Sequence, residues 1–224
     1  MKRLIIIVEG FSEEEFVNNT LRYYFIENGI FDCAGIKIQT SPNHKGGFVN
    51  YEHLKNDIEK ILHSEADAIV STFVDFFRIP TSVPGYQEML KAVQPEQKVD
   101  ILEQSMARDI NHYRFVPYIQ KFEFEALLFS NNQGFSAIYE TVNPQIARAT
   151  QAIIDQYDNP EEINNHPNTA PSKRIQKILA EQGMTYDKVF EGNLIALEIG
   201  IHNILEKCPR FRAWVEKLVV ACSD

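Results

Sequence analysis

The chain has 224 residues, enough for one domain of ordinary size with an appendage or for two small domains. Its hydrophobic content of 44% is typical of a globular protein. Its formal net charge of −9 argues against a protein whose whole surface binds nucleic acid, because such binding depends on positive charge. No apolar run approaches the roughly 20 residues that a membrane-spanning helix needs, and the three cysteines lack the CxxC spacing of a zinc site. We therefore expect a cytoplasmic protein with reduced thiols and no membrane partner.

The first element predicted from the sequence is a buried strand. Residues 4–8 form a continuous apolar run, mostly β-branched, that stops at Glu9-Gly10. Ser12 is suited to cap a following helix, whose first turn would carry the acidic residues 13–15, where the helix dipole favours negative charge. This strand, tight turn and helix would present a site at the carboxyl end of the strand.

The later elements continue this alternation of strands and helices. We expect strands at residues 35–40, 68–74 and 114–120, and helices at 51–63, at 86–111 with a break near Pro95, and from 123 to 129. Beyond residue 130 the pattern is helical throughout. The sequence thus predicts an α/β domain over residues 1–130, with a helical C-terminal region over residues 131–224 packed on it.

Acidic residues follow three of the predicted strands. Glu9 follows the first, Asp75 the third, and Glu123 and Glu125 the fourth. Because the carboxyl ends of parallel strands meet at one edge of a sheet, we expect these carboxylates to gather there. Gathered carboxylates repel one another unless a cation neutralises them, and hard oxygen ligands select Mg²⁺ or Mn²⁺. Taken singly, each of these residues is better explained as a solvated or capping residue at a strand end, and Glu13 by the helix dipole; the agreement of three strand ends is what favours a site.

Basic residues in three segments are candidates for binding phosphate. Lys45 lies in a loop with two glycines, although the spacing is not that of a P-loop and a simple turn is the alternative. Lys173 and Arg174 stand at a predicted helix start, where positive charge is unfavourable by itself and is sometimes tolerated for phosphate binding; the alternative is a solvated helix face with Ser172 as N-cap. Arg78 follows Asp75 closely and would contact the same phosphate or pair with a nearby acid.

The string Val8-Glu9-Gly10-Phe11-Ser12-Glu13 resembles the first motif of Toprim domains (the topoisomerase–primase fold), in which a strand ends in a Glu-Gly pair and a helix follows. Segments 72–85, 122–129 and 170–175 extend the resemblance in the same order, so that it covers most of the chain. The whole pattern is similar to a bacterial family of uncharacterised stand-alone Toprim-like proteins, related to the Toprim domains of overcoming-lysogenization-defect nucleases.

The resemblance implies a Rossmann-like Toprim core with a mostly parallel central sheet and metal-dependent nucleic-acid chemistry. It implies that Glu9, Asp75 and Glu125 are catalytic, and that metal ligands come from these three together with Glu13 and Glu123. It also implies a partner ATPase of the ABC or SMC-like type, in phage defence or DNA processing. One position departs from the family pattern: Toprim domains carry Asp-x-Asp at the third strand, and here the second position is Phe77. Either another carboxylate replaces the missing one, or the site holds a single ion, or it is inactive.

The leading hypothesis is therefore a Mg²⁺- or Mn²⁺-dependent nuclease, or a related phosphodiester-processing enzyme, acting on DNA or RNA. The first alternative is a non-catalytic interaction module of an ATPase complex, which Phe77 favours. The second is a nucleotide-binding protein, which the acidic composition would suit equally well.

Overall fold

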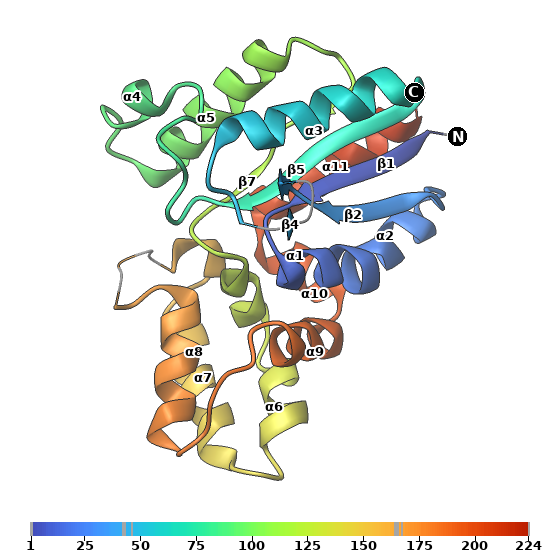
Figure 1. Cartoon of the computed structure of the whole chain (residues 1–224). Coiled ribbons are helices and arrows are strands. Elements are labelled where there is room, and N and C mark those ends of the chain that lie inside the picture. Colours follow the sequence, from blue (N-terminus) through green and yellow to red (C-terminus); the bar gives the residue numbers. More distant parts are fainter. Residues whose placement is uncertain (1, 42–43, 46, 164–165, 167, 224) are drawn as a thin grey trace.

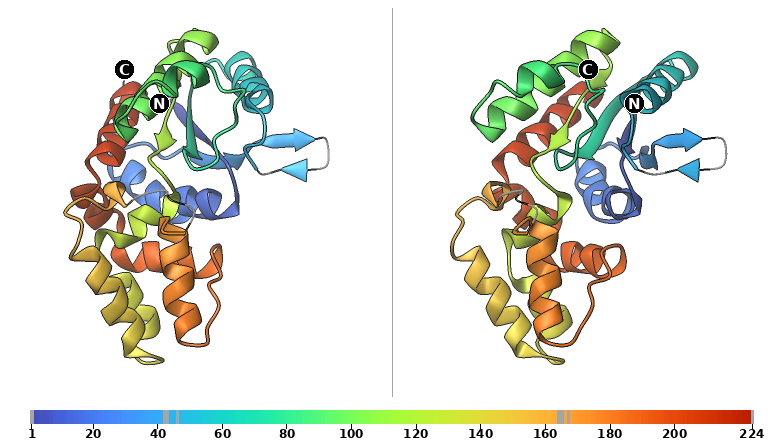
Figure 2. Two further views of the ribbon diagram at one scale, coloured as in Figure 1. Left: turned by 90° about the vertical axis from the view of Figure 1, so that its left-hand side faces the viewer. Right: turned by 60° about the vertical axis from the view of Figure 1, so that its left-hand side comes forward.

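The computed structural model describes residues 2–41, 44–45, 47–163, 166 and 168–223, without the side chains of residues 40, 41, 44 and 45. Its centre is a parallel sheet in the order β2-β1-β5-β6, and β7 pairs with β5 beyond the end of β6 (Figure 1). A two-stranded hairpin, β3 and β4, projects away from this sheet (Figure 2). The strands are β1 (Arg3–Val8), β2 (Cys33–Lys37), β3 (Gln39–Ser41), β4 (His44–Lys45), β5 (Ala68–Asp75), β6 (Phe115–Val116) and β7 (Ile119–Gln120).

Strands β1 and β5 lie at the centre of the sheet, and their sequences explain why. Both are continuous apolar or small-residue runs, and every residue of β5 is buried, as a strand covered on both faces requires. The two strands pair in parallel with Val8 opposite Phe73. This register places the residues that follow Val8 beside the last residues of β5, at the carboxyl end of the sheet.

Helices cover both faces of the sheet. On one face the apolar side chains of residues 16–25 and of the last helix, including Phe211 and Trp214, pack against β1 and β5. On the other face two helices contribute Leu54, Ile58 and Leu102. The helices are α1 (Phe11–Glu15), the π-helical segment η1 (Phe16–Leu21), α2 (Arg22–Glu27), α3 (Tyr51–Ser64), α4 (Tyr86–Met89), α5 (Pro95–Ile110), the 3₁₀ segment η2 (Phe124–Ser130), α6 (Gln133–Tyr139), α7 (Pro144–Ile154), the 3₁₀ turn η3 (Pro160–Glu162), α8 (Pro171–Glu181), α9 (Phe190–Ile199), α10 (Ile201–Lys207) and α11 (Pro209–Ser223).

The C-terminal helices divide between a separate lobe and the sheet. Helices α6 to α9 form a layer beyond the carboxyl end of the sheet, whereas α11 returns along one face of the sheet and ends near the N-terminus (Figures 1 and 2). The Trp214 indole stacks on Tyr118, with ring centroids 4.4 Å apart, and donates a hydrogen bond to Ser71. The boundary at residue 130 stays a prediction, but residues 209–223 belong to the packing of the α/β core.

Three local expectations need correction. The first helix begins at Phe11 with Gly10 as its N-cap, and Ser12 is buried inside it. The predicted fourth strand is split at Pro117-Tyr118 into β6 and β7, because proline lacks the N–H that a continuous ladder requires. Residues 124–130 form a 3₁₀ helix and not an α-helix. None of the helices in the described part of the chain is long and apolar enough to cross a membrane.

Candidate functional site

Glu9 and Asp75 meet at the carboxyl end of the sheet, as the sequence predicts. Glu9 follows β1, and its carboxylate accepts hydrogen bonds from the backbone of Phe48 and of Asp75 itself. Asp75 ends β5, is 8% exposed, and accepts a hydrogen bond of 2.9 Å from the backbone N–H of Phe124. Burial raises the pKa of both carboxyls, and the negative charge of Glu9 raises the pKa of Asp75 further.

Glu13 joins this pair from the first turn of α1. Its side chain is 4% exposed, and its negative charge raises the pKa of Glu9 and of Asp75. A Cβ at Gly10 would lie 3.0 Å from Oε2 of Glu13, so a larger residue there would displace the Glu13 carboxylate from its present position. The glycine thus leaves room for a second carboxylate within one turn of the first.

Glu125 completes the cluster from η2. The chain leaves β7 through Phe122, which has the uncommon positive φ of 73°, and then enters the 3₁₀ segment. Glu125 is 0% exposed, and neither of its carboxylate oxygens has a hydrogen-bond partner among the described residues. Its pKa is raised to about 7, chiefly by burial and also by the neighbouring Glu123 and Glu13, against the opposing effect of a lysine. A fully buried carboxylate lowers the stability of the fold when it is ionised, unless a cation lies beside it.

That cation is Lys188, a residue that the sequence analysis missed. Its ammonium lies 3.2 Å from Oε1 of Glu125 and 3.8 Å from Oε1 of Glu13, and it also lowers the pKa of Asp75 and of Glu9. Lys188 stands in the linker between α8 and α9, two residues before α9 begins. A positive charge at a helix N-terminus is unfavourable by itself, and this was the signal in the sequence that could have singled it out.

The cluster defined by Glu9, Glu13, Asp75 and Glu125 (the carboxylate cluster) has the donor chemistry that Mg²⁺ and Mn²⁺ prefer. Within the described ranges, no three acidic, histidine or cysteine side chains are gathered tightly enough to hold a metal ion. Lys188 lies against two of the four carboxylates. Apart from the ion pair with Lys188, the buried oxygens of Glu125 have no partner among the described residues, which fits a metal whose place the ammonium takes.

Glu123, predicted as a metal ligand, instead forms hydrogen bonds with Ser172. Its two carboxylate oxygens accept hydrogen bonds of 2.9 Å from the backbone N–H and 3.0 Å from the hydroxyl of Ser172. Ser172 lies in the first turn of α8, so Glu123 caps that helix, where the dipole favours a negative charge. We therefore leave Glu123 out of the proposed ligand set.

The predicted phosphate-binding residues do not gather at the carboxylate cluster. Arg78 is exposed, has a positive φ of 61°, and lies over the ring of Phe77. Lys173 bonds Gln176 on the exposed face of α8. Arg174 donates to the backbone oxygen of Thr169 and to the Tyr157 hydroxyl, which secures the segment before α8. The side chain of Lys45 lies outside the described residues.

Phe77 occupies the position where the resemblance calls for a second aspartate. Its backbone N–H donates a hydrogen bond of 2.9 Å to the carbonyl of Phe122, and its side chain is half-buried. The residue therefore joins the end of β5 to the turn that carries Glu123 and Glu125. Glu13 and Glu125 are the carboxylates that stand near Asp75 in place of the missing one.

Comparison with known proteins assigns the chain to a family. The family model "Domain of unknown function (DUF4276)" matches residues 8–219, which is nearly the whole chain. The chain belongs to the DUF4276 family. A search of curated proteins found no match.

Solved structures support the predicted α/β fold of this DUF4276 member. The C-terminal region of the Burkholderia pseudomallei OLD protein is similar with a TM-score of 0.54 and 14% sequence identity, over 99% of both chains. The C-terminal region of the Xanthomonas campestris pv. campestris OLD protein, phased with platinum, is a weaker match, with a TM-score of 0.48, 12% identity, and coverage of 99% of this chain and 94% of the other. The likeness to OLD proteins expected from the sequence, and the α/β class with a parallel sheet, are both confirmed.

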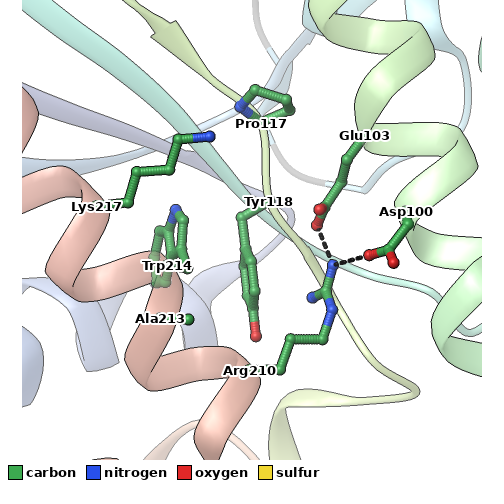
Figure 3. A pocket seen from close by; sticks show the side chains of 8 residues that line it. All are labelled: Asp100, Glu103, Pro117, Tyr118, Arg210, Ala213, Trp214 and Lys217. Carbon is green, nitrogen blue, oxygen red and sulfur yellow. Dashed lines mark hydrogen bonds and ion pairs between the residues drawn. The ribbon is translucent and has the colours of Figure 1, made fainter.

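A second polar cluster in this DUF4276 protein lies along the sheet and is built around Arg210. Figure 3 shows a cavity of about 200 Å³ in which the Arg210 guanidinium faces Glu103 and Asp100, beside the stacked rings of Tyr118 and Trp214. It shares no lining residue with the carboxylate cluster. Because its charges pair with one another, we interpret it as a structural network.

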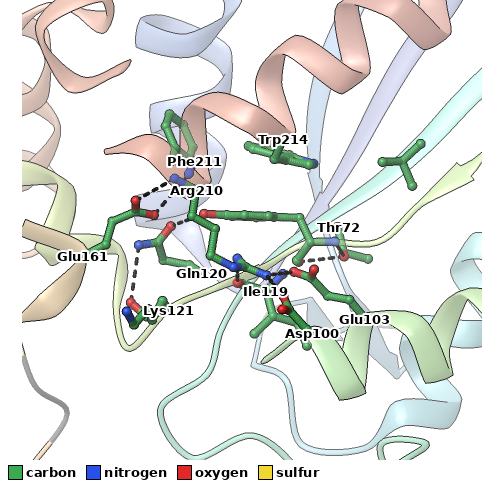
Figure 4. Close-up of polar contacts among 12 residues, drawn as sticks. Thr72, Asp100, Glu103, Ile119, Gln120, Lys121, Glu161, Arg210, Phe211 and Trp214 are labelled. Atoms are coloured by element: carbon green, nitrogen blue, oxygen red, sulfur yellow. Dashed lines mark hydrogen bonds and ion pairs between the residues drawn. The ribbon is translucent and has the colours of Figure 1, made fainter. Parts of the chain in front are cut away.

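The network fixes the strand that leads into the site. Glu103 accepts the backbone N–H of Ile119 and the guanidinium of Arg210, which in turn donates to the Ile119 carbonyl (Figure 4). Glu161, which is 0% exposed, accepts the backbone N–H groups of Arg210 and Phe211 at the start of α11. The network thus holds β7, and β7 is followed within a few residues by Glu125.

We expect Arg210→Met to lower the free energy of unfolding by about 2–4 kcal/mol, because it leaves the half-buried Glu103 without its counter-ion. Lys177→Met is the matched control, since Lys177 forms an exposed pair with Glu181 at 3.9 Å and should cost about 0.3–0.5 kcal/mol or less. Urea denaturation of both variants measures the difference. Equal stability of the two would contradict the assignment of Arg210 to a structural network.

The raised pKa of Glu125 predicts how stability depends on pH. In the unfolded chain a glutamate titrates near about 4.3, whereas the folded value is about 7. The folded state therefore binds the proton more tightly. Its contribution is fully present below the unfolded pKa and is lost as the pH rises through about 7.

The metal-free protein should accordingly lose about 2–3 kcal/mol of stability from this group between pH 4.5 and 7.5. Glu125→Gln removes the ionisation and should flatten that part of the curve. The matched control is Asp67→Asn, an exposed residue before β5 that should leave the curve unchanged. The measurement is denaturant unfolding across this pH range in EDTA, and the same slope in Glu125→Gln and wild type would refute the assignment.

Proposed function

We propose that this protein is a Mg²⁺- or Mn²⁺-dependent nuclease. The observation that carries the proposal is the gathering of four carboxylates, from two strand ends and two helical segments, around one lysine. Lys188 pairs with Glu13 and with the fully buried Glu125, and its charge also acts on Glu9 and Asp75. A structural role alone does not explain why so many acids are buried together at a cost in stability. The fold of the OLD C-terminal region fits the proposal at the level of architecture.

The proposed ligands are Glu9, Glu13, Asp75 and Glu125. A bound Mg²⁺ would orient the phosphate, stabilise charge on its oxygens and lower the pKa of a water molecule. Glu9 is the carboxyl best suited to hold or pass a proton, because it is less buried than the others and its pKa is raised by burial and by Glu13. Lys188 pairs with Glu13 and Glu125, and a cation held by those two carboxylates would leave its ammonium free to pair with a phosphate.

We also propose, from the family that the sequence resembles, that an ABC or SMC-like ATPase is the partner and that the protein acts in the cytoplasm in phage defence or DNA processing. A net charge of −9 gives the chain little general affinity for nucleic acid, so a partner that delivers the substrate suits it. Three buried cysteines, all free, suit a reducing compartment.

The competing function is a non-catalytic interaction module, in which Lys188 neutralises the carboxylates permanently. One observation favours it: the described residues gather no ready metal site, and Phe77 stands where an aspartate is expected. The two functions differ in whether a divalent cation displaces Lys188.

The test is hydrolysis of end-labelled single-stranded and duplex oligonucleotides, DNA and RNA, by the purified protein in Mg²⁺, Mn²⁺ or EDTA. The proposal predicts cleavage that requires the metal and that Glu9→Gln removes. Metal-independent cleavage would point to a contaminating enzyme. No cleavage of any substrate by a protein that also fails to bind Mn²⁺ would favour the interaction module.

A further inference from the structure

Beside the carboxylate cluster lies an apolar groove that the proposed chemistry does not use. It has a volume of about 360 Å³, and its walls include Phe11, Val189, Phe190, Leu194 and Leu197, with Asn19 at one side. We call it the Phe11–Phe190 groove. Phe11 is 58% exposed and Phe190 is 64% exposed, so two aromatic rings from different helices are left open to solvent at one place.

Both walls of the groove come from chain segments that also carry a residue of the carboxylate cluster or its counter-ion Lys188, although none of those residues lines the groove itself. Phe11 directly follows Gly10 of the Glu-Gly pair, and Val189 and Phe190 directly follow Lys188. A substrate whose phosphate reached Lys188 would therefore place its neighbouring groups in the groove. Asn193, which lines the groove, also donates a hydrogen bond to the carbonyl of Ser12, which ties α9 to α1 and holds the two walls together.

The rim of the groove carries charge of both signs: Glu15 lines it, and Lys37 lies beside Phe11 in an ion pair. The ammonium of Lys37 lies 3.4 Å from the centroid of the Phe11 ring and pairs with Glu14. Further along the same helix, Arg22 and Tyr23 are exposed and line a second cavity of about 190 Å³. From Phe11 to Tyr23 the chain runs through α1 and η1 into α2, a rise of at most about 18 Å, which is room for a few nucleotides. Aromatic rings alternating with basic and amide side chains form the pattern on which single strands stack.

We propose that the Phe11–Phe190 groove stacks an unpaired nucleobase next to the scissile phosphate, so that the protein acts on single-stranded or unpaired segments. This inference rests on the proposed function. A partner helix is the other occupant to consider, but the groove is small, and Glu15, Asn19 and Asn193 interrupt its apolar lining. Bases of a paired duplex have no free face to offer, whereas every unpaired base has one.

The test is binding of a short oligonucleotide containing 2-aminopurine, single-stranded or in a duplex, with Ca²⁺ in place of Mg²⁺ so that binding is separated from cleavage. Quenching of 2-aminopurine fluorescence reports stacking, and anisotropy of an end label reports affinity. We expect the wild type to prefer the single strand, and Phe11→Ala and Phe190→Ala each to weaken that binding roughly tenfold and to abolish quenching. Phe11→Leu and Phe190→Leu should behave like the alanine variants, because the ring and not apolarity is required.

Tyr113→Ala is the matched control, because Tyr113 is an 85% exposed aromatic residue just before β6, at the opposite end of the sheet. It should leave binding unchanged. Single-strand affinity that is the same in all four phenylalanine variants as in wild type would overturn the inference and point to a protein partner in the groove. If hydrolysis by those variants is also unchanged, the inference fails while the nuclease function stands. If the wild type shows ring-dependent stacking but hydrolyses no substrate, the proposed nuclease function is refuted and the inference about the groove stands.

Discussion

Asp75→Asn should reduce metal-dependent hydrolysis by about 10³-fold, because a metal ion supplies several kcal/mol of transition-state stabilisation and each ~1.4 kcal/mol is tenfold in rate. Asparagine keeps the size of the side chain and the oxygen that accepts the Phe124 N–H, so the fold should persist. It removes the negative charge at the centre of the carboxylate cluster, where Glu9, Glu13 and Glu125 all act on Asp75.

The rate should be measured at saturating Mn²⁺ on the oligonucleotide that the wild type cuts best. Asp67→Asn is the control, because it makes the same substitution at an exposed residue directly before β5, away from the carboxylate cluster. It should leave the rate within about twofold. Equal rates for Asp75→Asn and wild type would remove Asp75 from the metal site, and with it the argument from converging strand ends.

Lys188→Met should destabilise the metal-free protein by about 1–3 kcal/mol, a value reduced from that of a fully buried pair because the Lys188 side chain is 39% exposed. The buried Glu125 and Glu13 lose their counter-ion in this variant. Millimolar Mn²⁺ should then restore more stability to Lys188→Met than it adds to wild type, because the ion no longer competes with an ammonium for the same oxygens.

Thermal unfolding of both proteins with EDTA and with Mn²⁺ gives the four values needed. Lys177→Met controls for the loss of a lysine, since its pair with Glu181 is exposed. A variant that Mn²⁺ stabilises less than it stabilises wild type would mean that Lys188 helps to bind the ion and does not stand in its place.

The strands and the main acidic residues were predictable because both depend on local sequence. The apolar runs that end at Glu9 and Asp75 define β1 and β5, and parallel pairing brings their ends together without any knowledge of distant contacts. The helices α3 and α5 follow equally from their apolar periodicity, and their bounds differ from the expected ones by only a few residues.

The residues that the sequence could not place are those fixed by tertiary contacts. Lys188 lies in an irregular linker, and it reaches Glu13 and Glu125 only because the lobe of α6 to α9 packs across the end of the sheet. Glu123 and Glu125 are two positions apart, and the sequence predicts the same role for both. At the start of the 3₁₀ segment η2, however, Glu123 faces Ser172 and Glu125 faces Lys188. The return of α11 to the sheet likewise depends on long-range contacts such as that of Trp214 with Ser71.

Calorimetric titration of Mn²⁺ into the wild-type protein at pH 7.5, with Asp75→Asn and Asp67→Asn alongside, tests the claim that the carboxylate cluster is a metal site. Our account predicts saturable binding to the wild type and to Asp67→Asn, with release of protons from the carboxyls of raised pKa, and no binding to Asp75→Asn. Absence of saturable binding to the wild type at millimolar Mn²⁺ would contradict it, and would leave Lys188 as the permanent counter-ion of a site without metal.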